Sequence, residues 1–286
     1  METRGSLVAE ASAALSSAGF EEALRHARRL VASALAISPA GLFADPDHIV
    51  DKQQSFRVKE MVARMVEHEP LSRILGRREF WGLELTLSAE TLDPRPETET
   101  VVEAVLRRKP DRYAPLRLLD LGTGTGCLLL ALLGEFGTAR GVGIDIVEAA
   151  VKTAAHNAAK LGFAERAVFL VGDWAVAVRG SFDVIVANPP YIASGNLRLL
   201  PREVADYDPC RALDGGEDGL APFRAIAPSL SKLLTSDGIF VTEVGVHQAD
   251  AVAAILGARG VRLDGFERDL AGHIRCVVAR RGVPRA

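Results

Sequence analysis

The four residues Asn188-Pro189-Pro190-Tyr191 have the side chains in this chain that are best suited to chemistry. They follow the apolar run 182–187, which is typical of a buried β-strand. Each proline fixes its own φ angle and lacks a backbone donor, so we expect a rigid polar pocket at the end of that strand. There the Asn188 side-chain oxygen and a proline carbonyl can accept the two protons of a planar –NH2 group, while the Tyr191 ring covers its face. This chemistry suits methyl transfer to an amide or exocyclic amine nitrogen; the alternative is a proline-stiffened loop without a chemical role.

A glycine-rich loop follows an earlier predicted strand. Its sequence is Gly122-Thr123-Gly124-Thr125-Gly126, and glycines allow the backbone to turn tightly and to approach a ligand closely. Cys127 stands where the dinucleotide-binding pattern requires a glycine, and no Gly-Lys-Ser/Thr sequence of a phosphate-binding loop follows. The loop alone is therefore weak support for any particular ligand.

Acidic and aromatic residues end the next two predicted strands. Asp145 can accept hydrogen bonds from both hydroxyls of a ribose, as acidic residues do at this point of nucleotide-binding folds, although it can also serve only as a helix cap. Asp173 can accept from an adenine amino group, and the Trp174 indole can cover the ring. Together with the glycine loop and residues 188–191, these groups fit S-adenosylmethionine as the methyl donor. The arrangement requires no metal, and we predict none.

Strands and helices alternate in the second part of the chain, which predicts a mainly parallel sheet with helices on both faces. The last two strands are separated only by residues 267–273. Because that is too short for a parallel crossover, the sheet should end in an antiparallel hairpin. The predicted strands are 116–121, 141–146, 168–172, 184–187, 239–244, 262–266 and 274–279.

The first part of the chain is predicted to be helical. Apolar residues recur at helical spacing in the segments 7–18, 24–35 and 58–66. Residues 80–87 then alternate between apolar and polar types, which indicates a strand or hairpin. We therefore expect three parts, a helical domain at 1–74, a β-hairpin linker at 75–97 and a methyltransferase domain at 98–286.

Composition limits the possible classes of protein. The chain has 286 residues, of which 48% are hydrophobic and 25% charged, as in ordinary globular proteins. Its net charge is −3 and residues 1–74 carry no excess of basic residues, which argues against a protein whose main function is to bind nucleic acid. The three cysteines are widely separated, so a disulfide framework or zinc site is not expected. No run spans a bilayer and no secretory signal begins the chain, so we expect a cytoplasmic protein without a membrane partner.

With these motifs in place, the chain resembles the peptide chain release factor N5-glutamine methyltransferases, the PrmC/HemK family. Asn-Pro-Pro-Tyr is shared with enzymes that methylate amino groups of DNA and RNA, whereas the segment 94–99 is more specific to this family. One departure is Asp93, where many members carry an apolar residue. The motifs that carry the resemblance are Phe80-Trp81-Gly82, Pro94-Arg95-Pro96-Glu97-Thr98-Glu99, Asp120–Gly126, Asn188–Tyr191, Ala212–Gly219 and Asp269–His273.

The resemblance implies an α/β fold, namely a seven-stranded, Rossmann-like class I methyltransferase sheet with an antiparallel last strand, plus a small N-terminal helical domain. It also implies the substrate, the glutamine of the Gly-Gly-Gln motif in release factors 1 and 2, which the N-terminal domain helps to dock. On this view S-adenosylmethionine and the glutamine both contact Asn188. Arg95 and Glu97 are expected to border the glutamine pocket or the methionine end of the cofactor; a linker held by salt bridges is the alternative. We expect a monomer that requires no nucleic acid.

Three other functions compete with this interpretation. An adenine-N6 methyltransferase acting on DNA or RNA would share residues 188–191 but would need a basic surface and room to flip a base. A binding scaffold without activity is disfavoured because the transfer motif is intact. An NAD-linked oxidoreductase is disfavoured by the glycine spacing.

Overall fold

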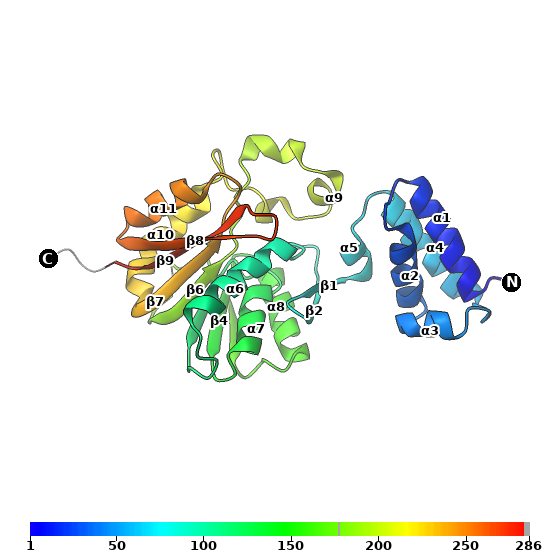
Figure 1. The fold of residues 1–286 in the computed structure, drawn as a ribbon, viewed down its shortest axis with the longest axis horizontal. Coiled ribbons are helices and arrows are strands. Elements are labelled where there is room, and N and C mark those ends of the chain that lie inside the picture. The colour runs from blue at the N-terminus through cyan, green and yellow to red at the C-terminus, as the bar shows by residue number, and fades with distance from the viewer. Residues whose placement is uncertain (177, 283–286) are drawn as a thin grey trace. The chain divides into compact units, whose positions relative to one another are not determined.

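The computed structural model describes residues 1–176 and 178–282, which divide into two compact units (Figure 1). The N-terminal unit contains Met1–Arg77 together with the short segment Arg202–Tyr207. The larger unit contains Arg78–Pro201 and the chain from Asp208 onward. Within the described ranges, no helix is both long and apolar enough to cross a membrane.

The N-terminal unit consists of helices that share one apolar core. The Thr3 side chain accepts a hydrogen bond from Ser6 N in a capping box, and the Asp51 side chain accepts from Gln54 N at the start of another helix. Leu15 and Leu30 are fully buried between the helices. The helices are α1 (Arg4–Ser17), α2 (Ala23–Ala34), α3 (Pro39–Ala44), α4 (Lys52–Val66), α5 (Leu71–Leu75) and α9 (Arg202–Ala205).

The three helices predicted for this unit are confirmed as α1, α2 and α4. The short helices α3 and α5 were not predicted, because each is too brief to show a full apolar period. The segment around α9 lies with this unit because Tyr207 Oη donates to the Glu67 carbonyl at 3.2 Å, and His68 Nδ1 lies 3.4 Å from Glu203 Oε1.

A two-stranded hairpin, β1 (Arg77–Phe80) and β2 (Leu83–Thr86), follows the N-terminal helices. Its two turn residues, Trp81 and Gly82, have φ angles of 51° and 70°, as a two-residue hairpin turn of the primed type requires. The Trp81 backbone N–H donates to Glu99 at 2.8 Å, which ties the turn to the first residue of α6 (Glu99–Arg108) within the larger unit. The predicted hairpin is therefore confirmed.

The larger unit is built around a seven-stranded sheet of order β5-β4-β3-β6-β7-β9-β8 (Figure 1). Pairing is parallel from β5 to β7, whereas β9 is antiparallel to both β7 and β8. This confirms the predicted fold class and the antiparallel end of the sheet. The strands are β3 (Arg117–Leu121), β4 (Arg140–Asp145), β5 (Ala167–Val171), β6 (Phe182–Ala187), β7 (Leu234–Glu243), β8 (Val261–Arg268) and β9 (Ile274–Arg281).

Helices cover both faces of this sheet because successive strand residues point to opposite sides. Leu118 of β3 packs into the core under α6 and α7, while its neighbour Leu119 packs into the core under α10 and α11. The helices of this unit are α6 (Glu99–Arg108), α7 (Cys127–Glu135), α8 (Glu148–Lys160), α10 (Ala221–Leu233) and α11 (Ala249–Gly257), with 3-10 turns η1 (Pro96–Thr98), η2 (Ser194–Leu199) and η3 (Cys210–Ala212).

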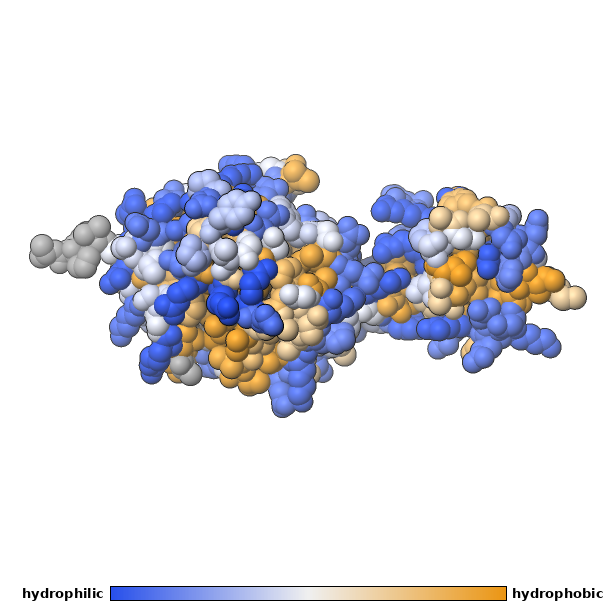
Figure 2. Space-filling model, turned by 90° about the horizontal axis from the view of Figure 1, so that it is seen from below, coloured by the Kyte–Doolittle hydropathy of each residue, from blue (hydrophilic) through white to orange (hydrophobic). Residues whose placement is uncertain are grey.

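Hydrophilic side chains cover much of the face shown in Figure 2, and hydrophobic ones form smaller patches. Exposed apolar residues include Val168, Leu170 and Val171 on the edge strand β5. The strand order reverses where β3 lies between β4 and β6, and ligands of open α/β sheets bind beyond the carboxyl ends of strands at such a point.

Candidate active site

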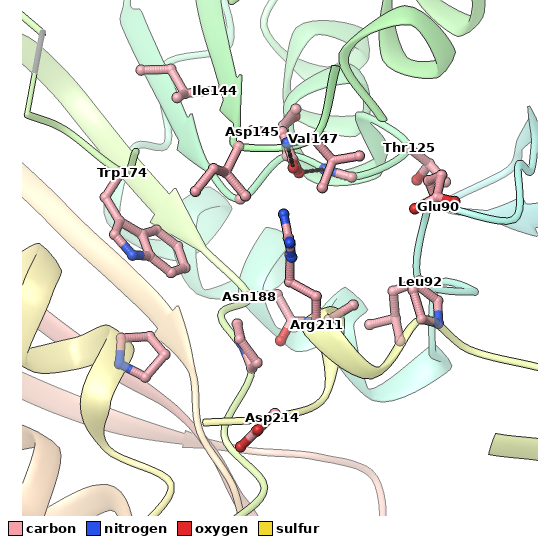
Figure 3. A pocket seen from close by; sticks show the side chains of 18 of the residues that line it. Glu90, Leu92, Thr125, Ile144, Asp145, Val147, Trp174, Asn188, Arg211 and Asp214 are labelled. Carbon is pink, nitrogen blue, oxygen red and sulfur yellow. Dashed lines mark hydrogen bonds between the residues drawn. The ribbon is translucent and has the colours of Figure 1, made fainter. Parts of the chain in front are cut away.

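A cavity of about 660 Å³ lies beyond the carboxyl ends of β3, β4, β5 and β6 (Figure 3). Its size is in the range of sites for small molecules and cofactors. Every residue that lines it belongs to the larger unit. The lining contains Glu90, Leu92, Pro94, Gly122, Thr123, Gly124, Thr125, Cys127, Ile144, Asp145, Ile146, Val147, Gly172, Asp173, Trp174, Asn188, Pro190, Pro209, Cys210, Arg211, Ala212, Asp214 and Pro222.

The glycine loop forms one wall of the cavity. Gly122, Gly124 and Gly126 have φ angles of 74°, 53° and 83°, which L-residues with side chains rarely adopt. The loop is held in place from several sides: Thr123 Oγ1 donates to Asp120 at 2.6 Å, and Asn157 Nδ2 donates to the Thr125 carbonyl at 2.9 Å. Its backbone is therefore presented to the cavity in a fixed conformation.

Asp145 ends β4 and accepts two backbone hydrogen bonds. Gly124 N donates to Oδ2 and Val147 N donates to Oδ1, each at 2.9 Å. The carboxylate therefore supports the glycine loop and the chain before α8. Because an ionised carboxylate offers about four acceptor sites, it retains capacity for hydroxyl donors of a ligand in the cavity.

Trp174 lies at the end of the cavity away from Thr125 and Glu90 (Figure 3), and Asp173 also belongs to the lining. Trp174 has a φ angle of 46°, an uncommon backbone conformation for a large side chain. A Cβ atom at Gly122 would lie 3.2 Å from its ring, so the indole packs directly against the glycine loop. The site thus contains a flat aromatic surface beside a carboxylate.

The Asn-Pro-Pro-Tyr residues follow β6 and form a hydrogen-bond network with β7. Asn188 Nδ2 donates to Thr98 Oγ1 at 3.1 Å, and Thr98 Oγ1 donates to Glu243 Oε2 at 2.6 Å. Tyr191 Oη donates to the other oxygen of Glu243 at 3.1 Å. Asn188 and Pro190 line the cavity, whereas Pro189 is buried behind it.

Burial raises the pKa of three groups at the site. It raises the pKa of Glu243 above its usual value, against the hydrogen bonds from Thr98 and Tyr191, which lower it. Burial and the nearby Glu243 charge raise the pKa of the Tyr191 phenol, so it stays a donor at neutral pH. Burial also raises the pKa of Asp120 to about 7.

Arg95 and Glu97 do not line the cavity, although the neighbouring Pro94 does. Arg95 forms an ion pair with the nearly buried Asp208, which fixes the start of the segment that leads to the cavity residues 209–212. Arg95 was expected to border the glutamine pocket or the methionine end of the cofactor, or else to hold the linker through a salt bridge. The ion pair with Asp208 is a contact of the second kind.

Several cavity residues were not predicted from the sequence. Glu90 and Leu92 lie on an irregular segment, and Arg211 lies in the short turn η3; none of the three belongs to a recognisable motif. Asp214 lies in the motif 212–219 but was not predicted to line the site. Figure 3 shows the Arg211 side chain extending into the cavity from near Asn188 and Leu92 toward Asp145. Among the described residues that line this cavity, Arg211 is the one cation, beside carboxylates of four residues, namely Glu90, Asp145, Asp173 and Asp214.

The cavity fits S-adenosylmethionine in size and in the groups that line it. The glycine loop leaves room for close backbone approach, Asp145 has acceptors for ribose hydroxyls, and Trp174 with Asp173 provides a surface and an acceptor for an adenine. The four carboxylates in the lining outnumber its one guanidinium, which suits a ligand with a sulfonium and an ammonium group.

Comparison with known proteins agrees with this interpretation. Residues 114–258 match the family described as "Methyltransferase domain", and residues 6–76 match "PrmC N-terminal domain". A solved methyltransferase from Pyrococcus furiosus shares the fold, with a TM-score of 0.53 and 14% identity over 79% of this chain and 100% of that one. The fold and cavity are those of a class I methyltransferase.

Two curated relatives identify the family more closely. The chain is 47% identical to the release factor glutamine methyltransferase of Rhodospirillum rubrum, over 92% of this chain and 81% of the relative. It is 42% identical to the protein of that name from Agrobacterium fabrum, over 93% of both chains. The chain belongs to the release factor glutamine methyltransferase family, which confirms the resemblance found in its motifs.

Proposed function

We propose that this protein transfers a methyl group from S-adenosylmethionine to the side-chain amide nitrogen, N5, of the Gly-Gly-Gln glutamine in peptide chain release factors 1 and 2. The observation that carries this proposal is its family membership, with relatives of that activity aligned over most of both chains. The position of Asn188 and Pro190 in the lining of the cavity supports it.

S-adenosylmethionine supplies an activated methyl group on sulfur. In our proposal the loop 122–126 approaches it closely, Asp145 accepts from its ribose, and Asp173 with Trp174 holds its adenine. Arg211 is assigned to its carboxylate, because this guanidinium is the cation among the residues that line the cavity. Hydrogen bonds from backbone to Asp145 keep that carboxylate in place for binding.

The residues after β6 are proposed to orient the substrate amide. An amide nitrogen is a weak nucleophile because its lone pair is delocalised into the carbonyl. The Asn188 side-chain oxygen and the Pro189 carbonyl accept its two protons, which fixes the nitrogen in line with the methyl group and stabilises the charge that develops on it. Pro190 and Tyr191 shape the pocket around the amide plane. The proton can leave after transfer, so no strong base is required.

The other parts of the chain are proposed to serve substrate binding. We assign docking of the release factor to the helical domain at 1–74 and a connecting role to residues 75–97, and the remaining chain carries the chemistry. Arg95 and Glu97 are proposed to border the glutamine site, Arg95 through its ion pair with Asp208. We also propose that the protein acts as a monomer. Because release factors act in translation, we infer a cytoplasmic location.

Incubation with labelled S-adenosylmethionine tests the proposed function. The protein is offered purified release factor 1, release factor 2, or DNA and RNA in separate reactions. We expect label on the release factors and none on nucleic acid. Label on adenine alone would show an amino-methylating nucleic-acid enzyme instead.

A further inference from the structure

Two buried residues outside the Asn-Pro-Pro-Tyr motif contact it from other elements. Thr98 precedes α6 and Glu243 ends β7, and each has a relative exposure of 1%. Asn188 Nδ2, Thr98 Oγ1 and Glu243 Oε2 form a continuous chain of hydrogen bonds of 3.1 and 2.6 Å. Buried polar side chains are costly to leave unpaired, so this chain has one preferred arrangement of donors and acceptors.

The arrangement follows from the single hydroxyl proton of Thr98. Glu243 accepts from Thr98 at one oxygen and from Tyr191 at the other, as an ionised carboxylate does. Because the Thr98 proton is directed to Glu243, its oxygen can only accept at Asn188. The Asn188 amide must therefore place its nitrogen toward Thr98, which leaves Oδ1 without a hydrogen-bond donor among the described residues.

We propose that Thr98, held by Glu243, is a positioning residue that fixes the amide of Asn188 in the orientation needed to accept a proton from the substrate –NH2 group. The inference rests on the proposed function, because only an amine or amide substrate needs an acceptor at this point. If the amide were reversed, Asn188 would present its own –NH2 group to the –NH2 group of the substrate. Both groups are donors, so no hydrogen bond could form between them. The buried carboxylate thus acts on the reaction through two intervening side chains.

Three variants test the role of the Thr98 hydroxyl. Thr98→Val keeps the shape but removes the hydroxyl, and Thr98→Ser keeps the hydroxyl. Thr100→Val is a matched control, since Thr100 is also buried and lies two positions further along the chain. Among the described residues, Asn188 donates to Thr98 and not to Thr100. The measurements are kcat, both KM values and thermal unfolding.

We expect Thr98→Val to lower kcat by about 10- to 100-fold, because the side-chain oxygen of Asn188 is then no longer held in position to accept from the substrate in the transition state. Both KM values should stay within about 3-fold of the wild-type values. The kcat values of Thr98→Ser and Thr100→Val should stay within about 3-fold of the wild-type value, because neither change removes a contact made in the transition state. Equal kcat values for Thr98→Val and the wild type would overturn the proposal, as would a loss in Thr98→Ser equal to that in Thr98→Val. If Thr98→Val unfolds, Thr98→Ala removes the same hydroxyl with less bulk and carries the same expectation.

Hydrogen exchange of the Asn188 side-chain amide tests the geometry without any substrate. Its NMR signal is identified by its absence from Asn188→Ala. We expect one –NH2 proton to be protected in the wild type and in Thr98→Ser, and that protection to be lost in Thr98→Val or Thr98→Ala. Equal exchange in all variants would refute the proposed orientation. If the amide is protected but the protein methylates no release factor, the proposed function is refuted while the proposed orientation of Asn188 stands.

Discussion

The hydroxyl of Tyr191 lies 3.1 Å from Oε1 of Glu243, so the last residue of the Asn-Pro-Pro-Tyr motif is bonded to the end of the neighbouring strand β7. Glu243 is fully buried, and its other oxygen accepts from Thr98. One carboxylate therefore holds two walls of the pocket in which the substrate amide is proposed to bind. The predictions below follow from this arrangement and from the cavity beside it.

Replacing Asn188 with alanine should remove the acceptor for the substrate amide. We expect kcat to fall about 100-fold or more, a loss typical of one removed group that stabilises the transition state. Affinity for S-adenosylmethionine should change much less, because most of its contacts lie elsewhere in the cavity. Single-turnover methylation and calorimetric titration measure the two quantities. Asn196→Ala, at an exposed position in η2, is the control, and near-normal turnover in Asn188→Ala would refute the assigned role.

The pH dependence of kcat should report the ionisation of Glu243. Burial raises its pKa, and the ionised form is the one that accepts from both hydroxyls, so kcat should fall as the pH is lowered through this raised value. Tyr191→Phe keeps the ring but removes a hydrogen bond that lowers the pKa of Glu243, so its acid limb should move to higher pH. Two other charged groups act on Glu243: Arg275 lowers its pKa and Glu97 raises it. The charge of Glu243 in turn raises the pKa of Cys127 and Cys276. An acid limb at the same pH in both proteins would contradict this account.

Arg211→Gln should weaken the binding of ligands that carry a carboxylate. We expect about 10-fold lower affinity for S-adenosylmethionine and S-adenosylhomocysteine, in line with the loss of one charge-assisted hydrogen bond. Affinity for 5′-methylthioadenosine, which lacks the amino-acid end, should not change. Arg198→Gln is a control on η2, outside the cavity lining. Equal losses for all three ligands would show that Arg211 does not contact the carboxylate.

Asp120 should make the stability of the protein depend on pH. Its pKa is raised by burial from 3.8 to about 7, so the folded state binds the proton more tightly than the unfolded state does. The stabilisation of the folded state by protonated Asp120 is complete at pH values below the pKa of Asp120 in the unfolded chain. It is lost as the pH rises from about 4 to about 7, by at most about 4 kcal/mol. Asp120→Asn has no group that titrates at this position. The free energy of unfolding of the wild type minus that of Asp120→Asn should therefore decline as the pH rises from about 4 to about 7. Urea unfolding at several pH values measures the difference, and parallel curves would contradict the assignment.

The sequence was sufficient for those parts of the fold that depend on local periodicity. Strand periodicity and the short connection before β9 predicted the sheet and its antiparallel end, and both are confirmed. The glycine loop was recognisable because glycine is required at its positive φ angles. These features are encoded by neighbouring residues, so a single sequence is enough to find them.

Other parts of the site depend on contacts between distant segments. Thr98 and Glu243 meet across 145 residues, and neither has a local pattern that predicts the contact. Arg211 enters the cavity from the turn η3, which is too short to show an apolar period. The ion pair of Arg95 with Asp208 likewise requires the folded chain. Tertiary packing, not residue type, determines these positions.

The most direct test of the central claim is to locate the transferred methyl group. Purified release factor is incubated with the protein and S-adenosylmethionine that carries a deuterated methyl group, and its peptides are sequenced by tandem mass spectrometry. We predict one labelled methyl on the side-chain nitrogen of the Gly-Gly-Gln glutamine with the wild type, and almost none with Asn188→Ala. Label on another residue, or no label on that glutamine under conditions in which the protein binds S-adenosylmethionine, would contradict the account.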